Sequence, residues 1–160
     1  MDSSNQELSM SVLMTPDKAN FSGKVHGGTI LKYLDEVAYA CASRYAGRYV
    51  VTLSVDHVTF RQAILVGELV TFMAQVMYTG RSSMEIGIKV LTENIIQRTV
   101  RHTNSCFFTM VALDDEGKSV AVPPLNPSTE ECKLRYAVAK ERRALRQAFI
   151  KQHQKLYDSY

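Results

Sequence analysis

The sequence predicts an α+β protein in which one long helix packs against an antiparallel sheet. The first observation is a helical repeat of apolar residues from Thr29 to about Tyr45. The second is a run of four strand-like segments with no helix between them. Short turns between such strands imply antiparallel pairing, because a parallel pair needs a crossover of about a dozen residues or more. The third is a helical pattern from Ser128 onward, which predicts an extra C-terminal helix.

Composition limits the chain to one soluble domain. Of its 160 residues, 46% are hydrophobic and 22% charged, which is enough for a single core but cramped for two. No apolar run approaches the roughly 20 residues that cross a bilayer, and the polar N-terminus lacks a signal pattern. The three cysteines form no CxxC pair, which favours buried thiols over disulfides or zinc. We therefore expect a cytoplasmic protein with no membrane partner.

The elements are then expected in the following order. The semi-apolar segment 8–14 favours an edge strand, ended by the turn residues Thr15-Pro16-Asp17. The long helix has a wide apolar face and is therefore well buried, and Gly47 follows it where glycine relieves left-handed strain. Thr79-Gly80-Arg81 is a tight hairpin connection. The four predicted strands lie at residues 49–60, 68–78, 82–93 and 99–113.

The chain after the sheet differs in charge. Pro123-Pro124 ends the sheet, because proline donates no ladder hydrogen bond, and Ser128 with Glu131 forms a capping box. Residues 1–127 hold 11 Lys/Arg against 12 Asp/Glu, whereas residues 128–160 hold 8 against 4. No nucleic-acid-binding motif accompanies these cations, so we interpret them as a solvated helix face and expect no nucleic-acid partner. The predicted organisation is a domain over 8–127 and a basic helical extension over 128–160.

The stretch from Asn20 to Asp35 carries the chemistry. Gly27 and Gly28 let the backbone approach a ligand, and the helix that they open leaves its first N–H groups unpaired and attractive to anions. Asp35 follows on an apolar stripe of the same helix. If that stripe faces the core, burial disfavours the charged carboxylate, whereas an ordinary surface aspartate is the alternative. Free amides that stabilise an oxyanion and a carboxylate that activates water suffice for acyl transfer.

Helix geometry separates these groups. At about 1.5 Å rise per residue, Asp35 lies roughly 10 Å from Gly28 along the axis, too far for both to contact one carbonyl. We therefore hypothesise a site between two subunits, with glycine amides from one and Asp35 from the other.

Neighbouring polar residues carry weaker signals. Asn20 can orient a water or hold an oxyanion, or it is simply a turn asparagine. His26 could serve as a base, but we favour a structural hydrogen bond as its role. Arg81, Ser82 and Ser83 match a phosphate group or form an ordinary polar turn. No ligand spacing or GxSxG motif is present, so we expect neither a metal nor covalent serine chemistry.

These motifs resemble those of a known family. Asn20-x-x-Gly23-x-Val25-His26-Gly27-Gly28, continuing to Asp35, with Val51-Thr-Leu-Ser-Val-Asp56 and Thr79-Gly-Arg-Ser-Ser-Met84, closely resembles the bacterial and brain-type cytosolic acyl-CoA thioester hydrolases of hotdog fold. The match extends from about Leu8 to Pro124. The resemblance implies a sheet wrapped around helix 28–45, two subunits that join their sheets, and usually three such dimers in a homohexamer.

The resemblance also implies cofactor-free hydrolysis of acyl-CoA to a fatty acid and CoA. Asp35 would be the general base or nucleophile, Asn20 its partner from across the interface, and the Gly28 amide the donor to the thioester carbonyl. The substrate-binding residues would be His26, Gly27, Arg81, Ser82 and Ser83. A non-catalytic acyl-CoA-binding regulator is the alternative, although the presence of both Asn20 and Asp35 argues against it. A hotdog dehydratase is less favoured, because His26 precedes the glycines.

Overall fold

A computed structural model of the protein describes residues 6–159. The chain divides into two compact units after Pro124. The first unit contains a five-stranded sheet and one long helix, α1. The second contains the helix α2, Glu130–Tyr157.

The sheet of the first unit is antiparallel throughout, as the sequence predicts. Its strand order is β1-β3-β4-β5-β2, so that β1 and β2 are the edge strands. The connection from β2 to β3 is consequently not a hairpin, because β2 pairs with β5 at the far edge. The strands are β1 Glu7–Leu13, β2 Val50–Asp56, β3 Leu69–Thr79, β4 Ser83–Asn94 and β5 Thr99–Ala112.

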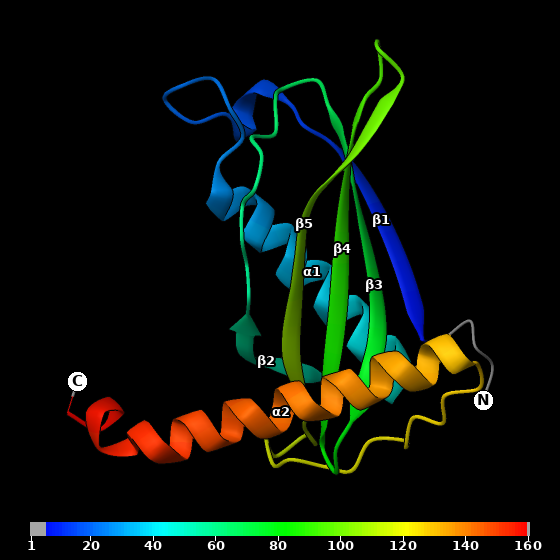
Figure 1. Ribbon diagram of the computed structural model, residues 1–160, viewed down its shortest axis with the longest axis vertical. Coiled ribbons are helices and arrows are strands. Elements are labelled where there is room, and N and C mark those ends of the chain that lie inside the picture. Colours follow the sequence, from blue (N-terminus) through cyan, green and yellow to red (C-terminus); the bar gives the residue numbers. More distant parts are fainter. Residues whose placement is uncertain (1–5, 160) are drawn as a thin grey trace. The chain divides into compact units, whose positions relative to one another are not determined.

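The helix α1, Gly27–Ala46, lies along one face of this sheet (Figure 1). It begins two residues before the predicted start and ends at Ala46, and the next residue, Gly47, has a φ of 62°, which confirms the left-handed cap. One face is buried among the strands and forms the core with them. Its buried residues are Ile30, Leu34, Val37, Ala38, Cys41, Ala42 and Tyr45.

Three local predictions differ from the structure. The turn after β1 is a short 3-10 helix, Pro16–Lys18. The strand β2 ends at Asp56 rather than near residue 60, because His57 has a φ of 56°, which a strand cannot continue. The N-cap of α2 is Thr129 rather than Ser128, since the Thr129 side chain accepts a hydrogen bond from the Cys132 N–H at 3.1 Å.

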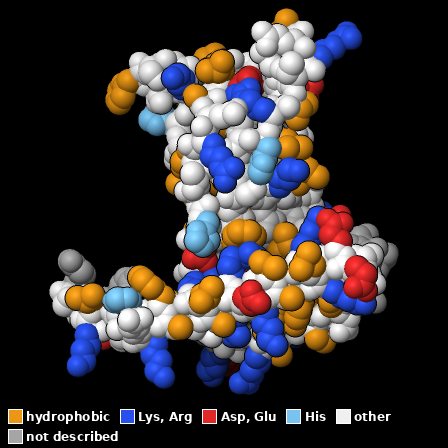
Figure 2. All heavy atoms as spheres, in the orientation of Figure 1, with side chains coloured by type: hydrophobic (Ala, Val, Ile, Leu, Met, Phe, Trp, Pro, Cys, Tyr) orange, Lys and Arg blue, Asp and Glu red, His pale blue; other side chains and the backbone are white. Residues whose placement is uncertain are grey.

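The helix α2 is largely exposed. Hydrophobic side chains share its surface with Lys and Arg, along the band at the bottom of Figure 2. Within residues 6–159, no helix combines the length and the apolar character that a membrane span requires. The exposed large hydrophobic residues of α2 are Leu134, Val138, Leu145, Phe149, Ile150 and Leu156.

Candidate active site

Asn20 lies in a tight loop that determines which end of its amide faces outward. Its Oδ1 accepts hydrogen bonds from the Ser22 N–H at 2.9 Å, the Ser22 hydroxyl at 2.8 Å and the Lys24 N–H at 3.2 Å. Backbone N–H groups only donate, so the contacted atom must be the amide oxygen. Within the described part of the chain the Asn20 NH2 group makes no hydrogen bond. The loop therefore presents this group as a donor.

The start of α1 presents two further donors. His26 is the N-cap, but its side chain makes no capping hydrogen bond, and its carbonyl oxygen accepts the N–H groups of Thr29 and Ile30. No hydrogen bond from the Gly27 or Gly28 N–H is found within residues 6–159. The first turn of α1 also carries no acidic residue to complement the helix dipole. This end of the helix is therefore suited to binding an anionic or oxyanionic group.

Gly28 has no reason to be glycine within a single chain. It lies in α1 without a positive φ, and a Cβ added there would meet nothing within 4 Å. A glycine in a helix costs roughly 0.5–1 kcal/mol relative to alanine, so its presence destabilises α1. The space above Gly28 is thus available to a ligand or a second chain. Gly27 differs, because a Cβ there would meet the Phe60 ring at 3.6 Å.

Asp35 is exposed, so of the two alternatives left by the sequence the core-facing carboxylate is wrong and the surface aspartate is found. The residues that bury α1 lie beside it, whereas Leu31 and Tyr39, one turn on either side, are 38% and 42% exposed. The Asp35 Oδ1 accepts a hydrogen bond of 2.6 Å from the Thr52 hydroxyl on β2. The pair borders an open surface hollow of about 340 Å³. The lining residues are Asp35, Glu36, Tyr39, Tyr49, Val50, Val51 and Thr52.

A tight connection joins β3 to β4 over residues 80–82, one residue later than the predicted turn Thr79-Gly80-Arg81, and Ser83 already begins β4. A hydrogen bond of 2.8 Å from the Gly80 N–H to the Ser83 carbonyl closes it. Ser83 pairs with Val111 of β5, and Val111 pairs with Val51 of β2. The turn therefore lies at the same end of the sheet as Thr52, two strands or about 10 Å away. The Arg81 side chain is exposed.

The predicted site residues thus form three groups rather than one. The first is the set of donors at the start of α1, with exposed His26 beside them, and the second is the Asp35–Thr52 pair. The third is the β3–β4 turn. The sequence interpretation assigned no role to Thr52, which lies on another element from Asp35, although its segment is among the motifs that resemble the family.

Cys41 and Cys106 agree with the prediction of buried, inert thiols, whereas Cys132 is only half-buried. Burial raises the pKa of both Cys41 and Cys106 to about 12, so their thiolate forms are scarce at neutral pH. Within residues 6–159, no three His, Cys, Asp or Glu side chains gather as a metal site. The expectation of a metal-free protein stays a prediction.

The fold and the site define a class. The hotdog architecture is a five-stranded antiparallel sheet around one long helix, here with a glycine turn at the helix start. The family model of the thioesterase superfamily matches residues 22–98 of the chain. The Helicobacter pylori protein VdlD is 49% identical over 140 residues, covering 88% of this chain and 80% of that protein. The human cytosolic acyl coenzyme A thioester hydrolase is 36% identical over 141 residues, covering 87% of this chain and 37% of that protein.

Solved structures of acyl-CoA thioesterases are similar to this chain over nearly its whole length. A hexameric acyl-CoA thioesterase is 34% identical, with a TM-score of 0.88 over 92% of this chain and 95% of that one. The Staphylococcus aureus acyl-CoA hydrolase, solved with butyryl coenzyme A and coenzyme A, is 30% identical with a TM-score of 0.88 over 98% of this chain and 96% of that one. The chain belongs to the thioesterase superfamily, among the acyl-CoA thioester hydrolases.

Three further structures of the S. aureus enzyme are alanine variants of an asparagine, an aspartate and a threonine. In that enzyme the aspartate follows the asparagine by 15 residues and precedes the threonine by 17. Asn20, Asp35 and Thr52 are separated here by the same two intervals.

Proposed function

We propose that the protein hydrolyses acyl-CoA thioesters to a fatty acid and free CoA. The observation that carries the proposal is the exposed Asp35 carboxylate, anchored by Thr52 at a surface hollow in a chain of this family. The Thr52 hydroxyl occupies Oδ1, and Oδ2 makes no hydrogen bond within residues 6–159, so this oxygen is available to accept a proton from water.

In the proposed reaction, Asp35 takes a proton from water while the water oxygen forms a bond to the thioester carbonyl carbon. The N–H of Gly28 and the NH2 group of Asn20 donate to the resulting oxyanion. The C–S bond then breaks, and the CoA thiolate receives the proton from Asp35. Direct attack by the carboxylate, with an anhydride that water then hydrolyses, reaches the same products.

The site is proposed to form between two subunits. Seven residues of helix separate Gly28 from Asp35 by roughly 10 Å along the axis, which one thioester carbonyl cannot bridge. Apolar side chains are exposed around Asp35, and β2 is an edge strand, so this surface is suited to a second copy. We propose a dimer in which each subunit completes the other's site, assembled three times into a hexamer.

The remaining residues are proposed to bind the substrate without a cofactor. The start of α1 is proposed to orient the thioester, and the β3–β4 turn to hold the anionic CoA moiety, because guanidinium and hydroxyl groups match phosphate oxygens. These substrate-binding residues are His26, Gly27, Arg81, Ser82 and Ser83.

Release of free thiol from acyl-CoAs of C2 to C18 tests the function. We expect release from at least part of the series, and the buried Cys41 and Cys106 thiols to contribute little background. Absence of release from every member, with acyl-CoA still bound in calorimetry, would overturn hydrolysis in favour of a non-catalytic regulator.

A mixed-subunit experiment tests the shared site. Asn20→Ala and Asp35→Ala chains, each expected to keep only a small residual activity alone, are unfolded together and refolded. We expect about a quarter of the sites of a random mixture to regain both residues, and activity to return accordingly. Mixtures as inactive as the single variants contradict a shared site.

A further inference from the structure

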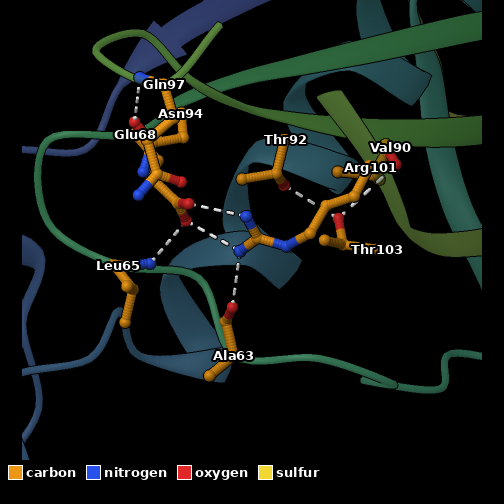
Figure 3. A network of polar contacts seen from close by, with 9 residues as sticks. All are labelled: Ala63, Leu65, Glu68, Val90, Thr92, Asn94, Gln97, Arg101 and Thr103. Atoms are coloured by element: carbon orange, nitrogen blue, oxygen red, sulfur yellow. Dashed lines mark hydrogen bonds and ion pairs between the residues drawn. The ribbon is translucent and has the colours of Figure 1, made fainter. Parts of the chain in front are cut away.

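The ion pair between Arg101 and Glu68 holds the segment 63–68, and this segment in turn contacts the loop that contains Asn20. The Arg101 guanidinium on β5 binds the Glu68 carboxylate with both ends, at 2.6 Å and 2.8 Å, and also donates to the Ala63 carbonyl at 2.8 Å (Figure 3). Glu68 is 4% exposed, and its Oε2 also accepts the Leu65 N–H at 2.8 Å. Both ends of the segment are therefore fixed to one strand by one guanidinium.

The other side of this segment holds the residues that follow Asn20. The Val25 N–H donates to the Ile64 carbonyl at 2.9 Å, and Lys24 pairs with Leu65 in an antiparallel bridge. Val25 and Ile64 are both buried, at 8% and 6% exposure. The segment 63–65 thus fixes the backbone of residues 24 and 25 by antiparallel pairing.

Lys24 in turn sets the conformation of Asn20. The Asn20 N–H donates to the Lys24 carbonyl at 2.5 Å, and the Lys24 N–H donates back to Asn20 Oδ1 at 3.2 Å. Lys24 therefore holds both the backbone of Asn20 and, together with Ser22, its side-chain amide. Contacts link Arg101 to Asn20 in three steps, across 81 residues of sequence.

We propose that Arg101 is a positioning residue for Asn20, acting through Glu68 and the segment 63–65. This role rests on the proposed function, in which Asn20 donates to the thioester carbonyl. Arg101 contacts no substrate in it. Its effect is to keep the Asn20 NH2 group in a reactive orientation, so that its loss lowers kcat while the KM for acyl-CoA changes little.

The test uses the double substitution Glu68→Gln with Arg101→Met. Removal of Arg101 alone leaves a buried carboxylate without its partner and threatens folding. The glutamine amide oxygen still accepts the Leu65 N–H, so only the link to β5 is lost. The matched control is Lys118→Met, which breaks an equally short but exposed ion pair with Glu116, 2.7 Å in length.

We expect the double substitution to lower kcat about tenfold in the natural background and at most about twofold in an Asn20→Ala background. Lys118→Met should alter neither value. Equal losses in the two backgrounds would mean that Arg101 acts independently of Asn20, and an unchanged kcat would remove the role altogether.

Hydrogen exchange separates this proposal from the proposed function. The double substitution should speed exchange of the Asn20 and Val25 amides at least tenfold, while the Gly47 amide at the other end of α1 keeps its rate. If the natural protein releases no thiol from any acyl-CoA, the proposed function fails, and the exchange rates still decide whether Arg101 holds the loop. Unchanged exchange of both amides overturns the positioning role.

Discussion

The two long helices begin in opposite ways. At the start of α2, Thr129 caps the Cys132 N–H, and Glu130 and Glu131 place negative charge against the helix dipole. At the start of α1, the N-cap side chain makes no capping bond, no acid lies in the first turn, and two glycines lower the helix propensity. At the start of α2, residues of the same chain thus supply a hydrogen-bond acceptor for a free N–H group and negative charge for the helix dipole. The chain leaves the start of α1 unsatisfied, which is the property of an end that binds a ligand.

The two helices also differ in what surrounds them. One face of α1 is buried against the sheet, and its exposed side carries Asp35 among apolar side chains at the hollow. The exposed surface of α2 mixes hydrophobic and basic residues over most of its length and includes no residue of the proposed site. Substitutions in α1 should therefore change activity, whereas substitutions in α2 should change only local stability.

The largest effect is expected from Asp35→Ala. Loss of the base should lower kcat by at least about 10²-fold, on the usual scale for general base catalysis, while the oligomer stays intact. Thiol release and size-exclusion chromatography measure the two quantities. Asp115→Ala removes a carboxylate from an exposed turn and is the matched control. An Asp35→Ala protein with normal turnover would refute the assignment.

Gly28→Ala comes next, with opposite effects on stability and activity. A Cβ at this position meets nothing within the chain, so the helix gains roughly 0.5–1 kcal/mol from the change. The same Cβ enters the space in which the thioester is proposed to bind, so we expect kcat/KM to fall about tenfold. Thermal unfolding and thiol release test this together. Full activity in a stabilised variant would show that no ligand approaches Gly28 closely.

The contrast between the helices also indicates what a sequence can predict. The period of α1, the glycine at its end and the antiparallel strands are local signals, and the structure confirms them. The exposure of Asp35 is not local, because its stripe is wide and periodicity alone does not show which edge of it faces the sheet. The sequence does not predict Thr52 as a site residue, because its contact with Asp35 joins two elements across 17 residues of sequence. Ser128 and Thr129 are neighbouring hydroxyl residues, and either could cap α2. Which of them does so depends on backbone angles, which the sequence does not show.

Acid should weaken the segment 63–68, which the Glu68–Arg101 ion pair holds beside the Asn20 loop, more than it weakens α2. The hydrogen bond from Arg101 holds the pKa of Glu68 below its ordinary value of 4.5, against the opposing effect of burial. A carboxyl with a lowered folded-state pKa stabilises the fold above about pH 4.5, and this contribution is lost as the pH falls through the folded pKa. The Tm of the natural protein should therefore fall more steeply between pH 5 and about pH 3 than that of Glu68→Gln. Glu130→Gln should leave the curve unchanged, since its ion pair with Lys133 is exposed. Parallel curves for Glu68→Gln and the natural protein would contradict this difference.

The smallest effect on function is expected from Thr129→Ala. The Cys132 N–H loses its acceptor, which costs about 1 kcal/mol at the start of α2 and should speed exchange of this amide about fivefold. Thr129→Ser keeps the hydroxyl and should exchange at nearly the natural rate. Thiol release should stay within about twofold of the natural value in both variants, because α2 satisfies its own start and offers nothing to the thioester. A tenfold loss of activity in Thr129→Ala alone would mean that the start of α2 also serves the site, and the distinction between a capped structural helix and an uncapped functional one would fail for this protein.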